Sequence, residues 1–457
     1  MITTIIRMAL GLFGLGIVVF VHELGHFIAA RFCGIEVEAF SIGWGKPFLK
    51  KKIGAVEYRL GMFPIGGYCK MKDQEDMPRF QKNSMDNINS EPQPEKGSFF
   101  AASPLRRIIV HFAGPFANIV FAILVLSFIW GIGFETYTLE NRIVLYSEIS
   151  EGENPADISG LKTGDRIIEV RGRRTNNFQE LQEIIAINAE VLLPLKIERQ
   201  GQLLDLEITP ALDRSTGAGR IGVLNWTEPV IGAVSEEGAA KRAGLEAGDR
   251  ILSINDVDFP YTVALIPIME QTPEFLDIQF ERNNNIMQSR LALSYNENGA
   301  ADLGIVWQYT RLVHPPLNPF MALARGTQDT WNRTFTTVRS LSLLFRGIDL
   351  TQAVSGPIRI TYMIGDAAAS GFGQSLGLGL SYMANFLALI SIALCIMNLL
   401  PLPILDGGMI ILYVIEAVRK KPMNPKFVNA FQTVGIILIF TLMIFAVFSD
   451  ILFIAKR

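Results

Sequence analysis

The sequence contains few cysteines and few charged residues, and each shortage excludes a class of protein. Its three cysteines, Cys33, Cys69 and Cys395, are far apart and form no CxxC pair, so we expect neither a disulfide framework nor a thiolate metal site. Charged residues make up only 19% of the chain and the formal net charge is −3, so we do not expect the strongly basic surface that nucleic-acid binding requires. Nucleic acid is therefore not an expected partner.

Hydrophobic residues are correspondingly abundant: they are 49% of the 457 residues, and they gather in four long stretches. Each stretch reaches the roughly 20 residues that span a bilayer as a helix. The first contains Glu23, and a charged side chain at membrane depth is costly enough to mark a functional site. The sequence therefore predicts a polytopic α-helical membrane protein with four transmembrane helices in contact with the lipid bilayer.

Lysine and arginine in the short loops predict the orientation of these helices. The loop after the first helix and the loop between the third and fourth are rich in both residues, so we expect both loops on the cytoplasmic side. The long segment after the second helix begins with an excess of glutamate. We therefore expect a multi-pass protein of the bacterial inner (cytoplasmic) membrane, with both termini and the long middle segment in the periplasm.

The middle segment contains one motif twice. The sequence GLKTGDRII at 160–168 recurs 84 residues later as GLEAGDRIL at 244–252, with six of nine positions identical. Alternating apolar residues and a charged hairpin follow each copy, a pattern typical of β-strands. The motif resembles the signature of PDZ domains, which bind extended peptides along the edge of a sheet. We expect two periplasmic β-rich PDZ domains between the second and third helices; a spacer without a working peptide groove is the alternative for each.

Two further segments complete the expected organisation. Apolar residues at helical spacing after the second β-rich domain predict an amphipathic helix, which either packs on those domains or lies on the membrane. Alternating residues after the first helix predict β-hairpins. The expected parts are the first helix in 1–34, a cytoplasmic or re-entrant β-hairpin region and linker in 35–103, the second helix in 104–134, the PDZ domains in 135–212 and 213–300, the amphipathic region in 315–374, the third helix in 375–408, a cytoplasmic loop in 409–426 and the fourth helix in 427–450.

The first predicted helix carries the sequence His22-Glu23-Leu24-Gly25-His26, an HExxH motif. Residues four apart share one face of a helix, so both imidazoles can bind one Zn²⁺ while Glu23 serves as general base beside the metal. Two structural histidines are a poor alternative, because polar groups in hydrocarbon need partners or a water-lined cavity. The motif therefore predicts a zinc site inside the membrane.

A catalytic zinc needs a third protein ligand and keeps one position open for water. His111 and His314 are candidates by residue type, whereas Asp406 has the better context. It ends the third apolar stretch in the sequence NLLPLPILDGG, residues 398–408. Two prolines there free backbone carbonyls, which are tolerated at membrane depth only beside protein or a water cavity.

The pair of HExxH in the first helix and NxxPxPxLDGG in the third resembles the motif pair of the site-2 proteases, and the tandem PDZ domains resemble the sigma-E-regulating bacterial branch of that family. The resemblance covers essentially the whole chain. It implies an intramembrane zinc metalloendopeptidase with His22, His26 and Asp406 as ligands and Glu23 as catalytic base. It also implies single-span membrane protein substrates: an anti-sigma factor already trimmed on the periplasmic side, whose cleavage activates an envelope stress response, and signal-peptide remnants.

The resemblance further implies a set of residues that bind substrate. Its members are Asn118 in a GPxxN segment of the second helix, Asn398, Pro401 and Pro403 in the third-helix motif, and Gly43 and Gly45 in a GxG segment that is similar to the family's membrane re-entrant β-loop. Trp44 stands where phenylalanine is commoner in that loop. We expect the PDZ tandem to act as a size filter that excludes substrates with large periplasmic domains.

Two other classes of function remain to be weighed. A metal transporter also places histidine and glutamate inside a membrane, although no inverted repeat of the transporter kind is evident in the sequence. A membrane-anchored PDZ scaffold would need no chemistry in its membrane helices. Zinc flux into vesicles would indicate the first, and function that survives a Glu23→Gln substitution would indicate the second.

Overall fold

The computed structural model describes residues 2–73, 95–150, 152–214, 216–235, 238–295, 301, 303–343, 356, 359–365, 376–421 and 423–455. The chain divides into two compact units. A helical unit contains residues 1–134, 314–341 and 350–457, and a β-rich unit contains residues 135–313 and 342–349. Most of the expected linker, and much of the region between 344 and 374, lie outside the described residues.

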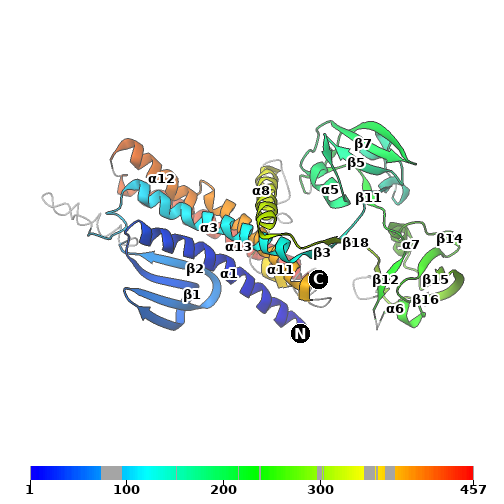
Figure 1. The fold of residues 1–457 in the computed structure, drawn as a ribbon, viewed down its shortest axis with the longest axis horizontal. Helices are drawn as coiled ribbons and strands as arrows, with labels where there is room; N and C mark the ends of the chain where they lie inside the picture. The colour runs from blue at the N-terminus through cyan, green and yellow to red at the C-terminus, as the bar shows by residue number, and fades with distance from the viewer. Residues whose placement is uncertain are drawn as a thin grey trace. The chain divides into compact units, whose positions relative to one another are not determined.

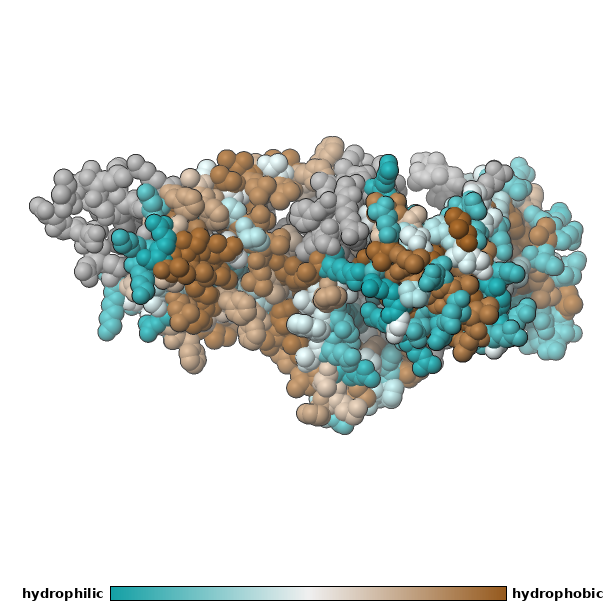
Figure 2. All heavy atoms as spheres, turned by 90° about the horizontal axis from the view of Figure 1, so that it is seen from above, coloured by the Kyte–Doolittle hydropathy of each residue, from teal (hydrophilic) through white to brown (hydrophobic). Residues whose placement is uncertain are grey.

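Four helices in the described part of the chain are long and apolar enough to cross a membrane, which confirms the predicted number. The helix α3 contacts both α1 and α11 (Figure 1). Hydrophobic side chains dominate the visible surface of these helices (Figure 2), as expected for surfaces that face lipid. The candidate spans are Ile6–Phe32 within α1 (Ile2–Phe32), all of α3 (Pro104–Ile132), Gly377–Leu399 within α11 (Leu376–Leu399) and Phe427–Asp450 within α13 (Pro425–Ala455).

Two long strands, β1 (Val37–Ile53) and β2 (Val56–Met71), form a sheet beside α1 in the segment where hairpins are expected. Both strands bend, so the first part of β1 pairs with two parts of β2, and Phe40 lies opposite both Tyr58 and Cys69. The bend in β1 falls at Gly43 and Gly45, whose φ angles of +83° and +90° are rarely adopted by residues with side chains. The glycines of the GxG segment are therefore required by the backbone itself.

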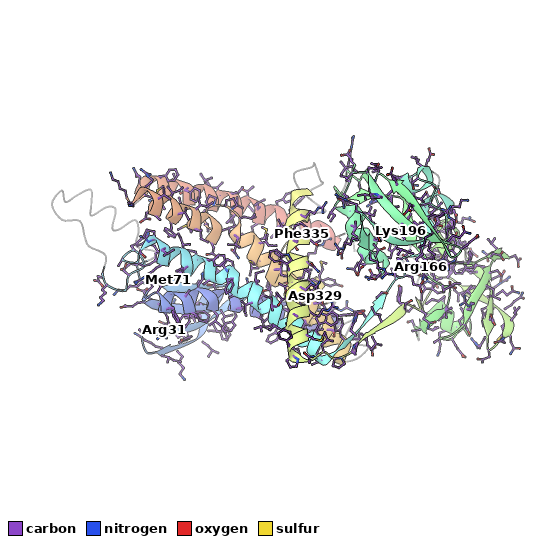
Figure 3. The ribbon with its side chains drawn as sticks, turned by 45° about the horizontal axis from the view of Figure 1, so that its top comes forward. Arg31, Met71, Arg166, Lys196, Asp329 and Phe335 are labelled. Atoms are coloured by element: carbon purple, nitrogen blue, oxygen red, sulfur yellow. The ribbon has the colours of Figure 1, made fainter. Side chains whose placement is uncertain are left out.

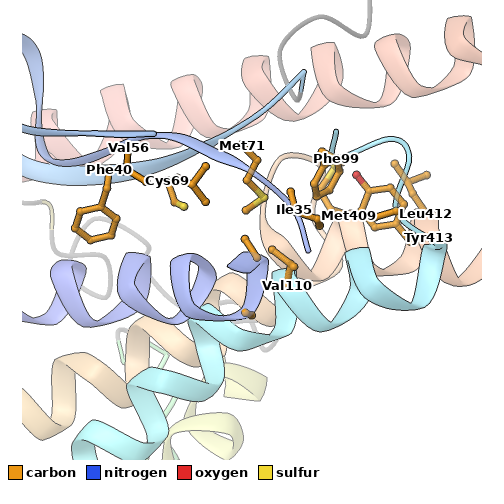
Figure 4. Packing of buried hydrophobic residues seen from close by; sticks show 14 of the residues in the cluster. Ile35, Phe40, Val56, Cys69, Met71, Phe99, Val110, Met409, Leu412 and Tyr413 are labelled. Atoms are coloured by element: carbon orange, nitrogen blue, oxygen red, sulfur yellow. The ribbon is translucent and has the colours of Figure 1, made fainter. Parts of the chain in front are cut away.

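The membrane helix α11 ends at Leu399, and residues 400–405 lead without helix into α12 (Asp406–Arg419). Residues 409–426, expected as a cytoplasmic loop, therefore contain most of a helix. This helix forms because one of its faces is apolar and buried: Met409, Leu412 and Tyr413 pack with Val110 of α3 and with side chains of the β1–β2 sheet in one hydrophobic cluster (Figure 4). The helix that begins at Asp406 is thus fixed against α3.

The β-rich unit contains two copies of one arrangement, as the repeated motif predicts. Each copy has a four-stranded antiparallel sheet, and the sheet orders β6-β5-β7-β8 and β14-β13-β15-β16 correspond strand for strand. Each also has a separate pair made by its first and last strands, and the first copy has one further pair, β9 with β10. In the first copy the elements are β4 (Ile143–Leu145), α4 (Pro155–Ile158), β5 (Arg166–Val170), β6 (Arg173–Arg174), α5 (Phe178–Ala186), β7 (Leu193–Arg199), β8 (Gln202–Ile208), β9 (Ala211–Leu212), β10 (Gly219–Arg220) and β11 (Val223–Asn225). In the second they are β12 (Ile231–Val234), α6 (Ala239–Arg242), β13 (Arg250–Ile254), β14 (Val257–Asp258), α7 (Leu265–Glu270), β15 (Phe275–Arg282), β16 (Asn285–Ala292) and β17 (Ile305–Trp307).

The boundaries of these copies lie later than the expected ends at residues 212 and 300. The strand β11 pairs with β4, and β17 pairs with β12, so each copy ends on a strand that returns to its own beginning. Long-range pairing of this kind leaves no local signal in the sequence, which explains the misplaced ends. Strands β3 (Phe134–Thr138) and β18 (Thr310–His314) pair with each other outside both copies.

The Gly-Asp step of the repeated motif has a structural role in each copy. Asp165 accepts hydrogen bonds from the backbone N–H of Lys162 at 2.8 Å and from Arg199 at 2.7 Å. Asp249 does the same with Glu246 and Arg282, at 2.8 and 2.6–2.7 Å. Both aspartates are only 1% exposed. A buried carboxylate needs such partners, and the identical solution in both copies shows that the motif maintains the fold.

The predicted amphipathic helix is α8 (Pro319–Leu343), and it exposes its apolar side chains. Phe320, Trp331 and Phe335 are 82%, 72% and 62% exposed, although all three are large and hydrophobic. The polar face packs on the membrane helices: Asp329 accepts a hydrogen bond from the indole N–H of Trp130 at 2.7 Å, and Arg333 donates to Asn385. Figure 3 labels Asp329 and Phe335 on this helix. Both expected roles of this apolar face, packing on the β-rich domains and lying on the membrane, stay predictions.

Candidate active site

Three buried side chains from two helices converge at one point of the helical unit. In α1, His22 and His26 lie four residues apart on one face, and their Nε2 atoms are 3.2 Å from each other. Oδ2 of Asp406, the first residue of α12, lies 3.4 Å from each of these nitrogens. Tetrahedral zinc with ligands at about 2.0–2.1 Å separates its ligand atoms by roughly 3.3–3.4 Å. The three atoms therefore fit a zinc ion, and this donor set leaves a fourth position open.

Glycines bring the two helices that frame the site into close contact. A Cβ at Gly114 of α3 would overlap Nε2 of His26, one of the three converging atoms. A Cβ at Gly25 of α1 would overlap the carbonyl oxygen of Ala113. Only glycine permits both approaches, so the glycines of the HELGH sequence and of the GPxxN segment are needed to build the site.

Each converging side chain has a hydrogen-bond partner on its outer side. Nδ1 of His26 lies 2.8 Å from the carbonyl oxygen of Val110, and Nδ1 of His22 lies 3.2 Å from the side-chain amide of Asn118. A histidine that binds a metal through Nε2 carries its hydrogen on Nδ1, so we assign the oxygen of the Asn118 amide to face His22. The amide nitrogen of Asn118 then occupies the buried position that has no hydrogen-bond partner among the described residues.

Glu23 lies at the edge of this group and beneath the last part of β2. Its side chain contacts Gly67, and the backbone N–H of Cys69 donates a hydrogen bond to its carboxylate. The strand segment from Gly66 to Cys69 pairs with β1 on one side, so Glu23 faces its other edge. A carboxylate in this position can act as a general base, and a strand edge can pair with an extended chain.

The other residues named from the sequence have varied positions. Asn398 donates its side-chain amide to the carbonyl oxygen of Leu394 at 3.0 Å, one turn back in α11. In the segment before Asp406, Pro401 is exposed and Pro403 is buried. Gly43 and Gly45 form the bend of β1 described above. His314, a ligand candidate by residue type, stacks on Phe134 with ring centroids 4.6 Å apart and is not part of the three-residue group.

Two partners of the site were not identified from the sequence. Nδ1 of His111 lies 2.8 Å from Oδ1 of Asp406, the carboxylate oxygen that does not face the two histidines. One turn earlier in α3, Arg107 forms an ion pair with Glu416 of α12. His111 was considered as a ligand because of its residue type, but its contact with Asp406 joins positions 295 residues apart and has no local signal.

Comparison with known proteins assigns the chain to a family. The model of peptidase family M50 matches residues 10–442. A Treponema pallidum protein that is provisionally named a zinc metalloprotease is 38% identical over 98% of this chain and 99% of its own length. The regulator of sigma E protease of Haemophilus influenzae is 32% identical over 96% of this chain and 97% of its own, and the regulator of sigma-E protease RseP of Escherichia coli is 31% identical over 95% and 96%. The chain therefore belongs to peptidase family M50, the site-2 proteases.

Proposed function

We propose that this protein cleaves single-span membrane proteins within the bilayer, with His22, His26 and Asp406 as zinc ligands and Glu23 as the general base. The chain is a multi-pass inner membrane metalloprotease of the site-2 type, and its cofactor is zinc, the metal in the name of its Treponema relative. One observation carries the assignment of residues. The three ligand atoms lie 3.2–3.4 Å apart inside the helical unit, next to the carboxylate of Glu23. That spacing matches a tetrahedral metal with one open position.

The chemistry follows from the positions of these groups. When bound, zinc supplies a Lewis acid that activates water and polarises a peptide carbonyl. Glu23 accepts the proton that the attacking water releases and then delivers it to the departing amine. The edge of β2 near Gly67 holds the substrate extended, because a peptide bond within a helix is shielded by its own turns. The amide nitrogen of Asn118 donates to the held chain or to its scissile carbonyl.

Purified full-length protein in detergent, incubated with a single-span substrate, tests this proposal. Cleavage is expected, and a zinc chelator should abolish it. Glu23→Gln should remove activity while zinc content stays near that of the parent, whereas Asp406→Ala should lower both. Glu207→Gln, at an exposed position of β8, is the matched control and should change neither. Equal loss of zinc in Glu23→Gln and Asp406→Ala would show that the roles are assigned wrongly.

The basic loops support an arrangement in which both termini and the β-rich unit lie in the periplasm. The two copies in that unit support the assignment as PDZ domains, since each has the repeated GLxxGD motif, a four-stranded sheet and a short helix. An apolar cavity of about 610 Å³ lies between the two copies, lined by Leu139 and Asn225 of the first and by α7 and Trp307 of the second. PDZ domains bind extended peptides along the edge of a sheet, and peptide binding by either copy stays a prediction.

We propose exclusion of untrimmed substrates as the main task of this PDZ tandem. Two folded domains inserted in the chain between the second and third membrane helices would hinder any substrate with a large periplasmic domain and admit trimmed ones, such as an anti-sigma factor after a first cut or a signal-peptide remnant. Deletion of residues 140–307 removes both copies and leaves β3 and β18 to be joined by a short linker. The deleted enzyme should cut trimmed substrate as before and begin to cut the untrimmed form. Continued sparing of the untrimmed form would contradict the filter.

The two rival classes make different predictions about the same residues. A metal transporter would carry zinc into vesicles, and a PDZ scaffold would function unchanged with Glu23→Gln. Membership of a peptidase family and the position of Glu23 beside the ligand atoms favour proteolysis over both.

A further inference from the structure

We propose that His111 is a positioning residue for the metal site, which holds the carboxylate of Asp406 so that only Oδ2 faces the zinc. This inference rests on the proposed role of Asp406 as a ligand. Nδ1 of His111 and Oδ1 of Asp406 are 2.8 Å apart, and both side chains are about nine-tenths buried. The two carboxylate oxygens are thereby divided: Oδ1 accepts from His111, and Oδ2 lies 3.4 Å from each histidine nitrogen.

Asp406 needs such a partner more than the two histidines do. His22 and His26 lie within one long helix that continues to Phe32, where backbone and rotamer leave little freedom. Asp406 instead follows a non-helical segment, and the residue two before it, Ile404, has a φ of +78°, which is unfavourable for a β-branched side chain. A carboxylate at such a position can rotate and present either oxygen, or both, unless one oxygen is held. The hydrogen bond from His111 holds one.

The ring of His111 is itself fixed by aromatic neighbours. It lies at 32° to the ring of Tyr413 with centroids 5.6 Å apart, and Phe99 contacts it edge-on at 5.9 Å. Its other nitrogen, Nε2, is buried and has no hydrogen-bond partner among the described residues. The contact with Asp406 is therefore the hydrogen bond that orients this imidazole. Because Tyr413 belongs to α12, the same helix supplies the ligand and the surface that orients its partner.

Three substitutions separate the hydrogen bond from the packing. His111→Phe keeps a flat ring against Tyr413 and removes the donor. His111→Asn keeps an N–H at the place of Nδ1, since both atoms are bonded to Cγ. His111→Gln moves the N–H one bond further, toward the place of Nε2. A partner of a metal ligand typically changes metal affinity by about 10- to 100-fold.

The test measures the zinc affinity of the full-length protein in detergent by competition with a chelator, using Zn²⁺ alone as the probe. We expect His111→Phe and His111→Gln to bind zinc about 10- to 100-fold more weakly than the parent, and His111→Asn to stay within a few-fold of it. Thermal unfolding of the metal-free proteins should be similar for the parent and His111→Asn. If His111→Phe fails to fold, the comparison of Asn with Gln decides alone.

Distinct outcomes would overturn the positioning role and the metal site. Zinc affinity like that of the parent in His111→Phe or His111→Gln would show that the Nδ1 donor does not hold Asp406. An equal loss of zinc affinity in His111→Asn and His111→Gln would show the same. If the parent binds no zinc, or if His22→Ala binds it as tightly as the parent, the proposed metal site is wrong and the role of His111 falls with it.

Discussion

Arg107 of α3 and Glu416 of α12 face each other in a two-bond ion pair, with Nη1 3.1 Å from Oε2 and Nη2 3.0 Å from Oε1. Their side chains are only 8% and 14% exposed. The guanidinium also lies 5.1 Å from the ring centroid of Tyr413, and Nε donates to the carbonyl oxygen of Ala102. The pair thus fastens the helix that starts with Asp406 to the helix that carries Gly114 and Asn118.

Removal of one member of this pair should lower the unfolding free energy much more than removal of both. Arg107→Met leaves Glu416 buried without its partner, and we expect a loss of about 3–5 kcal/mol in unfolding free energy. The double variant Arg107→Met with Glu416→Leu should recover most of that loss, because apolar replacements of both members of a buried pair are often neutral. Denaturant unfolding in detergent would measure the difference. Additive effects of the two single variants would contradict the coupling.

The close contact between α1 and α3 predicts a strong effect for a single methyl group. Gly114→Ala places that methyl against Nε2 of His26, and Gly25→Ala places it against the backbone of Ala113. We expect each to cost about 1–3 kcal/mol of stability by overpacking. Gly114→Ala should also lose zinc, since its clash is with a ligand atom.

Gly16→Ala provides the control for both substitutions, because nothing lies within 4 Å of a Cβ at this position of α1. It should leave zinc content and proteolysis unchanged. Unimpaired zinc binding in Gly114→Ala would show that α3 does not approach His26 as closely as described.

Glu228, in the loop between the two copies, should make the stability of the β-rich unit depend on pH. Oε2 of Glu228 lies 2.8 Å from Arg250 of the second copy, and Oε1 lies 3.6 Å from Arg142 of the first. Burial alone would raise the pKa of Glu228, but the hydrogen bonds from Arg250 and Trp226 outweigh it, so the pKa lies below its ordinary value. The charged form is therefore favoured by the folded state.

Glu228→Gln should reduce the stability of the β-rich unit at neutral pH, by on the order of 0.5 kcal/mol for a partly exposed pair. A depressed pKa means that the stabilisation is present above the usual glutamate range and is lost as pH falls through the lower folded value. The parent and the variant should therefore converge in acid. Urea unfolding at neutral and acidic pH checks this, and a gap that widens in acid would contradict it.

Cysteine labelling can test the orientation of the protein, but native cysteines are poor reporters because Cys69 and Cys395 are buried. In a variant with Cys33 replaced by serine, Lys51→Cys and Arg214→Cys introduce thiols at exposed positions of β1 and of the β-rich unit. Arg214→Cys should react with an impermeant reagent in intact cells, and Lys51→Cys only after permeabilisation, as the basic loops predict. The opposite order would reverse the proposed topology.

Local patterns of residues explain which features could be predicted from the sequence. Uninterrupted apolar stretches predicted the four membrane helices, and nine-residue similarity predicted the two copies in the β-rich unit. The spacing of His22 and His26 also placed their ligand atoms on one helical face. The contacts of Asp406 with His111 and of Asn118 with His22 depend on how separate helices pack. Such contacts have no period along the chain, so the sequence alone could not identify them.

The position of α12 illustrates a second limit. Its basic end predicted a cytoplasmic loop, yet Met409, Leu412 and Tyr413 pack on a hydrophobic surface formed by α3 and the β1–β2 sheet. That surface exists only once the sheet has folded beside α1. Tertiary burial therefore decided the structure of this segment.

The paired aspartate and arginine of each β-rich copy have a consequence for how this protein can evolve. Asp165 with Arg199, and Asp249 with Arg282, are both internal to their own copy. Natural selection for folding alone is enough to retain the GLxxGD signature in both. The surfaces around α5 and α7 are then free to diverge, and one duplicate can lose or change its ligand while the signature survives. Presence of the signature in a relative therefore reports shared ancestry of the domain, and peptide recognition has to be established for each copy separately.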